Sequence, residues 1–287
     1  MTVKKFKLLF KFLFICLLLR CALSFAQDEI VLKNGNVIRG SILKTDKSGL
    51  SIELSEPKAV IVVPLANIDK FRIEIPDFFR MAEDYYLAKK YDQAYPLYLK
   101  TIQKYGGFSW GEEAYFKAAD CQVKTGNVPK AIELYNAYIA DYPDAKLVNK
   151  ARMNLAALLS GKGDYGGAVK IYDAVIRSKD ELSRPDAYYG SAESYFAQGA
   201  YEQALVNYLK IEVLYYDKSN LVANAKFKSG ECYEKLGEGE RALVTYREII
   251  AEFPKSDFAS KSKTKLKKLE DRRKKDATER CGAYGRV

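Results

Sequence analysis

The sequence predicts a mainly α-helical protein: an α-solenoid of five helix pairs, preceded by a small antiparallel β-barrel or β-sheet domain. The first observation is an alanine that recurs at intervals of 37, 37, 36 and 38 residues, at Ala94, Ala131, Ala168, Ala204 and Ala242. Twelve positions before each stands another small residue, at Ala82, Ala119, Ala156, Ala192 and Gly230. Four positions after each stands a tyrosine, at Tyr98, Tyr135, Tyr172, Tyr208 and Tyr246. Because small residues let helices approach closely, this internal repeat predicts stacked helical hairpins.

The repeat divides the chain into segments with different compositions. A β domain is predicted at 27–75, because the apolar residues there are spaced for short strands, and Pro76 marks its end. Helical spacing follows, with glycine turns at Gly126, Gly163, Gly199 and Gly237. The predicted organisation is a signal peptide at 1–26, the β domain, five repeats at 76–256 (about 76–110, 111–147, 148–183, 184–221 and 222–256), a basic helix at 257–276 and a disordered tail at 277–287.

The positive charge is concentrated at the two ends of the chain. The formal net charge is +10, but residues 1–26 hold five Lys or Arg and no acid, and residues 261–287 hold eleven Lys or Arg against four acids. The remaining body is mildly acidic, which argues against a nucleic-acid-binding surface on the repeats. The chain has no histidine. That excludes imidazole metal sites and the usual serine triad.

Residues 1–26 predict export. Lys4, Lys5 and Lys7 precede a short apolar run at 12–19, and Ser24 and Ala26 fit a signal-peptidase site. The alternative is a membrane anchor, but the run is much shorter than the roughly 20 residues that a spanning helix needs. We therefore expect cleavage near Ala26 and a location in the periplasm or at the outer membrane. Lipidation is not expected, because Arg20 precedes Cys21 and Ile15 precedes Cys16.

The β domain opens with a hairpin pattern. Asn34-Gly35 lies between apolar pairs and predicts a two-residue hairpin turn. The stretch from Asp28 to Leu54, with its LKNG motif, resembles Sm-like small β-barrels. Sm-like domains often bind RNA, which an exported protein rarely meets. The domain is therefore interpreted either as a docking module or as a structural cap over the first repeat, and both remain open.

The helical part resembles the tetratricopeptide repeats. That family has small residues and aromatics at the repeating positions given above, and this chain adds further matching tyrosines at Tyr85, Tyr91, Tyr165, Tyr195, Tyr201 and Tyr233. The proline that ends a repeat is present only as Pro143 and Pro254. The longer repeat is similar to the bacterial periplasmic subgroup, which includes the Tol-Pal-associated cell-division coordinator and outer-membrane assembly lipoproteins. The resemblance implies a right-handed solenoid whose first helices line a concave groove.

Smaller features complete the helical prediction. Ser109 to Glu112 form a capping-box pattern that opens the second repeat, and Trp110 within it is expected to pack rather than bind a ligand. Cys121 and Cys232 occupy equivalent repeat positions too far apart for a disulfide and are expected to be buried. Cys281 is a thiol that could pair between chains.

The predicted binding groove consists of large apolar residues and carboxylates spaced four apart, with two further aromatics. Its residues are Phe79, Glu83, Tyr86, Phe116, Asp120, Met153, Tyr189, Glu193, Phe196, Phe227 and Glu231. Such a ladder suits an extended or helical peptide with apolar and basic side chains. The alternative is that the large residues pack neighbouring first helices together and the acids form a solvated rim.

Together these features predict a non-catalytic scaffold or adaptor of the bacterial cell envelope that binds protein or peptide partners. The alternative is a carbohydrate- or peptidoglycan-binding protein that uses the same aromatic residues. Nucleic-acid binding would require that residues 1–26 are not a signal. No catalytic residue, metal ligand or cofactor motif is predicted. The basic helix at 257–276 is expected to cover the last repeat with Phe258, Ala259, Leu266 and Leu269, and contact with an anionic partner or membrane surface is its functional alternative.

Overall fold

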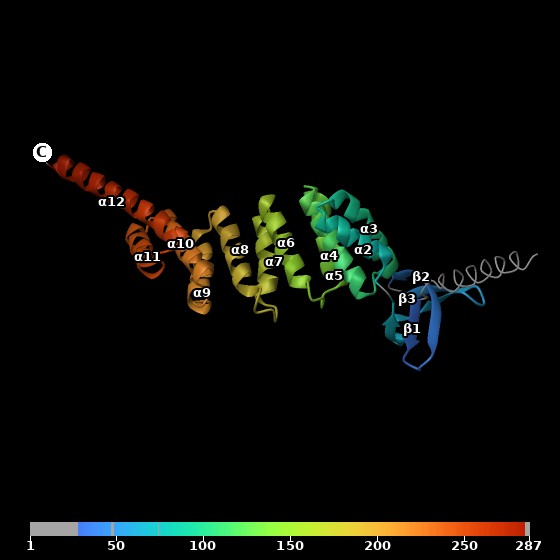
Figure 1. The fold of residues 1–287 in the computed structure, drawn as a ribbon. Helices are drawn as coiled ribbons and strands as arrows, with labels where there is room; N and C mark the ends of the chain where they lie inside the picture. Colours follow the sequence, from blue (N-terminus) through green and yellow to red (C-terminus); the bar gives the residue numbers. More distant parts are fainter. Residues whose placement is uncertain (1–27, 47–48, 74, 285–287) are drawn as a thin grey trace, which may run out of the picture. The chain divides into compact units, whose positions relative to one another are not determined.

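The structure is a computed structural model that describes residues 28–46, 49–73 and 75–284 (Figure 1). The predicted signal peptide and Cys16 and Cys21 lie outside these residues. The chain forms two compact units, one up to Leu134 and one from Tyr135. Within the described residues, no helix is both long and apolar enough to cross a membrane.

The first unit opens with a five-stranded antiparallel sheet. Its strands are β1 (Asp28–Leu32), β2 (Val37–Asp46), β3 (Gly49–Leu54), β4 (Ala59–Val63) and β5 (Ile68–Arg72), with the short 3₁₀ helix η1 (Leu65–Asn67) before β5. The strand order is β4-β3-β2-β1-β5, so β4 and β5 form opposite edges. The sheet is therefore open, and the barrel form of the prediction is wrong.

Residues from the helical part cover the apolar face of the open sheet. Ile30, Ile42, Leu50 and Ile52 form the sheet's core together with Tyr105 and Phe108, which lie at the end of the first helix pair and in the loop after it. Trp110 packs against the same cluster, as predicted. The sheet thus shares one core with the first repeat, which favours the interpretation of the domain as a structural cap.

Glycines permit this close approach. A Cβ on Gly107 would lie 2.4 Å from Cγ2 of Thr45 on β2, and a Cβ on Gly111 would lie 2.0 Å from the carbonyl oxygen of Tyr105. The Thr45 hydroxyl also donates to the Lys104 carbonyl at 3.1 Å. The seam between sheet and helices is therefore tightly packed.

The first hairpin has a three-residue loop rather than the predicted two-residue turn. β1 and β2 pair up to Val31 and Val37, and the Leu32 N–H donates to the Asn36 carbonyl. The Gly35 N–H donates to the Leu32 carbonyl, and Gly35 has a φ of 86°. A glycine in this left-handed conformation at the end of a three-residue loop is the alternative to the two-residue turn.

Helices α2 (Asp77–Leu87), α3 (Tyr91–Tyr105) and α4 (Ser109–Lys124) follow in the first unit. Helix α5 (Val128–Asp141) contains the boundary between the units. The N-cap of α4 is Phe108, whose side chain makes no capping hydrogen bond, so the predicted Ser109 cap is wrong. Phe108 takes this position because its ring belongs to the core under the sheet.

The second unit is helical. It contains α6 (Val148–Gly161), α7 (Tyr165–Ile176), α8 (Arg184–Ala197), α9 (Tyr201–Leu214), α10 (Ser219–Lys235), α11 (Gly239–Glu252) and α12 (Asp257–Tyr284). Consecutive helices pack against each other from α6 to α12. Pro143 and Pro254 follow the ends of α5 and α11, where prolines were predicted to stop helices.

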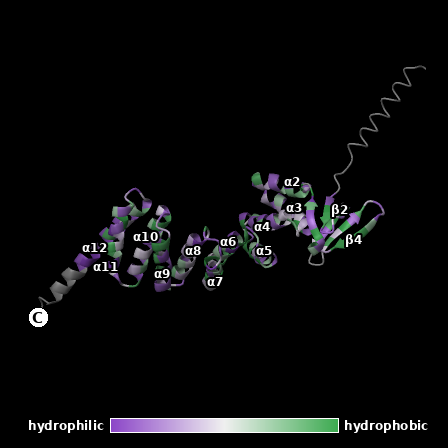
Figure 2. Ribbon diagram, turned by 90° about the horizontal axis from the view of Figure 1, so that it is seen from below, coloured by the Kyte–Doolittle hydropathy of each residue, from purple (hydrophilic) through white to green (hydrophobic). Residues whose placement is uncertain are grey.

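Helix α12 is longer than predicted. It continues to Tyr284, so the prediction of disorder is wrong for residues 277–284, which include strong helix formers such as Ala277 and Arg280. Phe258, Leu266 and Leu269 pack on the cluster of Phe227, Tyr246 and Ile249, which confirms the predicted stripe. Most of the other residues of α12 up to Lys275 are charged, and Figure 2 shows purple on this helix beside its label.

The fifteen repeating small residues and tyrosines are all buried. Gly190 and Gly230 show why small residues are needed, because a Cβ there would lie 2.4 Å and 2.6 Å from the rings of Tyr172 and Tyr246. Tyr172 and Tyr246 therefore pack into space that a larger residue at Gly190, two positions before Ala192, or at Gly230 would occupy.

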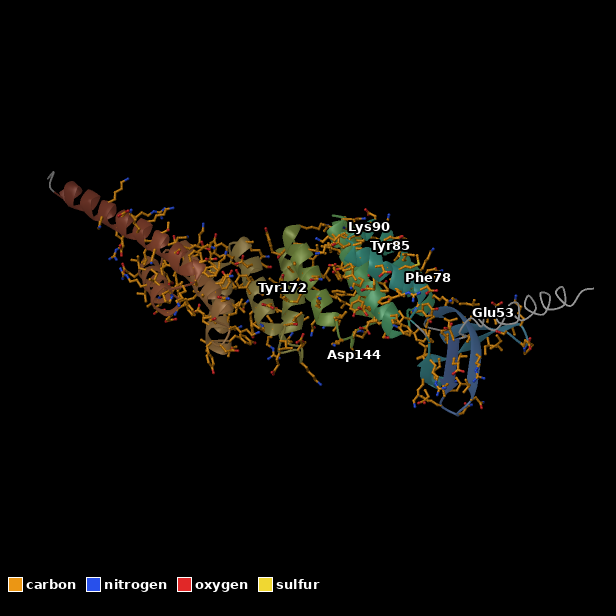
Figure 3. All side chains as sticks on the ribbon, in the orientation of Figure 1. Glu53, Phe78, Tyr85, Lys90, Asp144 and Tyr172 are labelled. Atoms are coloured by element: carbon orange, nitrogen blue, oxygen red, sulfur yellow. The ribbon has the colours of Figure 1, made fainter. Side chains whose placement is uncertain are left out.

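The turns within the helix pairs share one left-handed residue. Gly126, Gly163, Gly199 and Gly237 have φ angles between 78° and 84°. The equivalent position in the first repeat is Lys89, with a φ of 58°, next to Lys90 in Figure 3. A residue with a Cβ is strained in this conformation.

We predict that Lys89→Gly stabilises the chain by about 0.5–1 kcal/mol, because the relief of left-handed strain exceeds the added entropy of the unfolded chain. The measurement is urea unfolding followed by circular dichroism. The matched control is Gly126→Lys, which introduces the same strain in the second repeat and should destabilise by about 1 kcal/mol. A loss of stability in Lys89→Gly would contradict the strain argument.

We also predict that Phe108→Ala destabilises the first unit by about 3–5 kcal/mol, because it empties the core shared by the sheet and the helices. Hydrogen exchange should show faster exchange in β1–β3 and at the start of α4. Phe78→Ala is the control, because Phe78 is partly exposed on α2. Unchanged exchange in the sheet after Phe108→Ala would show that the sheet folds without the helices.

Candidate functional site

The predicted groove residues lie on the first helices of the pairs, α2, α4, α6, α8 and α10. On each unit we call the surface that these residues form the first-helix face. Phe79, Phe116 and Phe227 are buried on it, whereas Met153 and Tyr189 are half-buried.

These large side chains pack against the repeating tyrosines of the second helices. The ring centroids are 6.1 Å apart for Phe79 and Tyr98, and 5.7 Å apart for Tyr189 and Tyr208. Such edge-to-face pairs add to the stability that burial provides. The buried phenylalanine rings thus hold helices together, which agrees with the structural alternative for these residues.

In the first unit, the predicted carboxylates bind tyrosine hydroxyls and a lysine. Glu83 accepts a hydrogen bond from the Tyr98 hydroxyl and one from Lys117 Nζ at 3.1 Å. Lys117 Nζ also lies 4.3 Å from the centroid of the Tyr86 ring. The Tyr86 hydroxyl in turn donates to Asp120. These five side chains form one network on the first-helix face, with its charged atoms at the surface.

The second unit repeats this arrangement. Glu193 accepts from the Tyr208 hydroxyl and lies 3.3 Å from Lys228 Nζ. Lys228 also pairs with Glu231 at 3.5 Å and lies 5.3 Å from the centroid of the Phe196 ring. A carboxylate, a tyrosine of the same pair and a lysine of the next first helix therefore form a recurring unit.

The fifth and last repeat has a variant of this unit. The Tyr246 hydroxyl donates to Glu234 at 2.6 Å, and Lys265 of α12 bonds Glu234 at 2.9 Å and Glu231 at 3.1 Å. Lys265 Nζ lies 6.0 Å from the centroid of the Phe227 ring. Helix α12 thus supplies the lysine that a following repeat would have supplied.

Sequence reasoning missed Lys117, Lys228 and Lys265. Each follows a first-helix carboxylate, Glu83, Glu193 or Glu231, by 34 or 35 residues, which is close to one repeat. That regular spacing is the signal that could have identified them.

The third repeat lacks the unit. Ala157 occupies the carboxylate position and is exposed, while Tyr172 (Figure 3) remains buried. Nearby, Asn154 donates to the Tyr135 hydroxyl at 2.9 Å, and the hydroxyls of Ser160 and Ser194 lie 2.6 Å apart. Neutral hydrogen bonds therefore replace the charged network here.

The environment keeps the tyrosines neutral and the lysines charged. Burial, and then the hydrogen bond to a carboxylate, raises the pKa of Tyr98, Tyr208 and Tyr246. Burial alone would lower the pKa of Lys228, but the charges of Glu193 and Glu231 raise its pKa overall. These three tyrosines therefore stay neutral, and Lys228 stays charged, at physiological pH.

The site offers little for catalysis. Burial raises the pKa of the Cys121 and Cys232 thiols to about 12, so they are not thiolate nucleophiles. Both cysteines are free and buried, which confirms their predicted packing role. Cys281 is outside the part of the chain whose side chains are described. Among the described residues, no group of His, Cys, Asp or Glu is arranged to hold a metal ion.

Family comparison identifies the helix pairs. The tetratricopeptide-repeat family matches residues 113–145, 153–213 and 224–256. The chain contains tetratricopeptide repeats. No curated protein matches the sequence. The comparison thus supports the repeats, while the periplasmic subgroup and the Sm-like resemblance of the β domain remain predictions.

Solved tetratricopeptide-repeat structures share this fold. A repeat protein from Parabacteroides merdae is 14% identical with a TM-score of 0.57, over 73% of this chain and 78% of that one. MamA from Desulfovibrio magneticus is 12% identical with a TM-score of 0.53, over 64% and 99%. BtubC from P. vanneervenii is 14% identical with a TM-score of 0.52, over 62% and 80%. These likenesses show the solenoid fold. Tetratricopeptide repeats generally act as non-enzymatic scaffolds for protein–protein interaction.

We predict that Tyr208→Phe destabilises the second unit by about 1–2 kcal/mol, because it removes a buried donor to Glu193. The measurement is urea unfolding. Tyr216→Phe is the matched control, because Tyr216 is 80% exposed and its change should be negligible. Equal effects of the two substitutions would contradict a structural role for the hydroxyl–carboxylate bond.

Proposed function

We propose that the protein is a non-catalytic scaffold of the bacterial cell envelope that binds protein partners through the first-helix face of its tetratricopeptide repeats. The observation that carries the proposal is the recurring unit of carboxylate, tyrosine and lysine. It places partly exposed charges of both signs on first helices in each of the two compact units. A partner segment that presents alternating charges and backbone polar groups fits such a surface.

The charged side chains of the recurring unit are partly exposed, so a partner can contact them. Lys117 and Glu83 have side-chain exposures of 21% and 26%, and those of Lys228 and Glu193 are 23% and 40%. Partly desolvated charges discriminate between partners more strongly than fully exposed ones, because screening by solvent is weaker. The surface therefore favours specific recognition of a polar segment over insertion of large apolar side chains.

The envelope location rests on the composition of residues 1–26, with a basic start, a short apolar run and small residues before Gln27. The carbohydrate alternative is less favoured, because sugar stacking needs exposed aromatic faces, and Phe79, Phe116 and Phe227 are buried. The exposed basic residues of α12 would support contact with an anionic partner or membrane surface.

The test is affinity purification of the tagged protein from the native envelope, with and without Lys117→Met and Lys228→Met together. We expect these substitutions to release bound protein partners, because they remove the lysine from both complete units. The matched control changes two exposed lysines away from the first helices, Lys146→Met and Lys170→Met, and should retain the partners.

Two outcomes would contradict the proposal. Retention of all partners by the Lys117 and Lys228 variant, at unchanged unfolding midpoint, would exclude the first-helix face as the binding surface. Recovery of the intact chain, still carrying residues 1–26, in the cytosolic fraction would exclude the envelope location.

A further inference from the structure

A polar cleft lies on the second unit, away from the first-helix networks. It has a volume of about 390 Å³ and is bounded by α9, α10 and α11. Its lining includes Leu209, Glu212, Ser229, Tyr233, Val244 and Thr245. Lys226, Arg241 and Glu248 also contribute to its wall. Apolar and ionisable side chains thus meet in one concave site, as in pockets that bind a ligand group.

Glu212 departs from the internal repeat. It stands eight positions after Ala204, and the other four repeats all have isoleucine at this position, at Ile102, Ile139, Ile176 and Ile250. An isoleucine suits a seam between packed helices, whereas a carboxylate there loses hydration. The fourth repeat has therefore exchanged an apolar seam residue for a charge at a cost in stability.

Among the described residues, the carboxylate has no direct ion pair, although the charge of Lys226 acts on it from nearby. It accepts a hydrogen bond from the Ser229 hydroxyl at 2.7 Å, and within the described part of the chain it forms no ion pair. Burial raises the pKa of Glu212 despite that hydrogen bond. The cleft's lysine, Lys226, is bound by Glu248 at 3.0 Å and by Glu252 at 2.9 Å. A half-buried carboxylate without a direct ion pair would be stabilised by a positive group supplied from outside.

Three exposed valines lie on the helices that bound the cleft, and one of them, Val244, lines it. Val206 and Val213 lie on the same face of α9 as Leu209 and are 51% and 73% exposed, and Val244 of α11 is 52% exposed. We call these three residues the valine rim. Exposed apolar side chains on the helices that bound a cleft are a feature of interaction sites rather than of an ordinary solvated helix surface.

We propose that this cleft binds an arginine side chain carried by an apolar segment of a partner protein. The guanidinium would pair with Glu212, and flanking apolar side chains would cover the valine rim. Arginine suits the site because its planar head donates two parallel hydrogen bonds to a carboxylate and is weakly hydrated. This inference rests on the proposed function only in taking the partner to be a protein, since it uses a different surface.

The binding test uses the full chain and the capped tripeptide acetyl-Val-Arg-Val-amide, titrated while NMR signals of α9–α11 are followed. The control peptide has citrulline in place of arginine, which keeps the shape and removes the charge. We expect the arginine peptide to bind with a millimolar dissociation constant. The citrulline peptide should bind at least about tenfold more weakly, because it cannot form the desolvated charge pair. Equal shifts from both peptides, or no shift from either, would overturn the proposal.

Two variants of the chain test whether the peptide binds at Glu212. Glu212→Gln should weaken arginine-peptide binding by about tenfold or more. Glu202→Gln, an exposed change on the same helix, should leave it unchanged. Equal binding to Glu212→Gln and to the unchanged chain would overturn the assignment.

Glu212→Ile restores the repeat residue and gives a second readout. We expect it to abolish peptide binding and to raise Tm, because it returns an apolar side chain to the seam. A lower Tm would overturn the inference that the carboxylate was retained at a cost. These outcomes do not depend on Lys117 and Lys228, so failure here and failure of the proposed scaffold surface are distinguishable.

Discussion

The structure depends on burying a tyrosine between the two helices of each pair. The ring packs where the first helix carries alanine or glycine, and in three of the five pairs the buried hydroxyl donates to a carboxylate: Tyr98 to Glu83, Tyr208 to Glu193 and Tyr246 to Glu234. A buried hydroxyl without an acceptor is costly, so in these three pairs the acceptor stabilises the packing that the small residue permits, whereas Tyr172 of the third pair is buried with no carboxylate acceptor among the described residues. The requirement to bury the ring explains why residues on both helices repeat together.

The same requirement determines what the first-helix face offers a partner. Its carboxylates already accept from tyrosine hydroxyls, and lysines from the next helix neutralise them. The face is therefore a polar surface of paired charges, not an open ladder of apolar anchors edged with free acids. At the cleft beside Glu212 the arrangement of charges differs, because there a half-buried carboxylate accepts a hydrogen bond from Ser229 and has no direct ion pair among the described residues. The two surfaces would recognise different chemical groups.

The sequence predicted the helix pairs well because the residues that define them are the residues that pack. Ala94 and Tyr98 are informative because each fills a specific space, and the same holds in every repeat. Other features depend on distant parts of the chain. Whether the sheet closes depends on Tyr105 and Phe108, which cover its apolar face from the helical part. No local pattern in residues 28–75 contains that information.

The predicted groove residues lie on the expected helices, but their hydrogen-bond and ion-pair partners were not predicted, and their role in binding stays a prediction. Glu83 and Glu193 lie on the predicted face, yet their partners come from other helices, and only a comparison of repeats would have identified Lys117 and Lys228. The burial of Phe116 could not be read from helical spacing, because the same spacing fits an exposed stripe and a packed one. The hairpin loop at Gly35 differs for a local reason, since Asn-Gly also fits a three-residue loop.

The most direct test of the tyrosine–carboxylate constraint is a double-mutant cycle on Tyr208→Phe and Glu193→Gln, measured by urea unfolding of the full chain. If the hydroxyl and the carboxylate stabilise each other, the two losses are not additive, and the coupling energy is about 1 kcal/mol or more. Additivity within about 0.3–0.5 kcal/mol would show that the two groups act independently and would contradict the account.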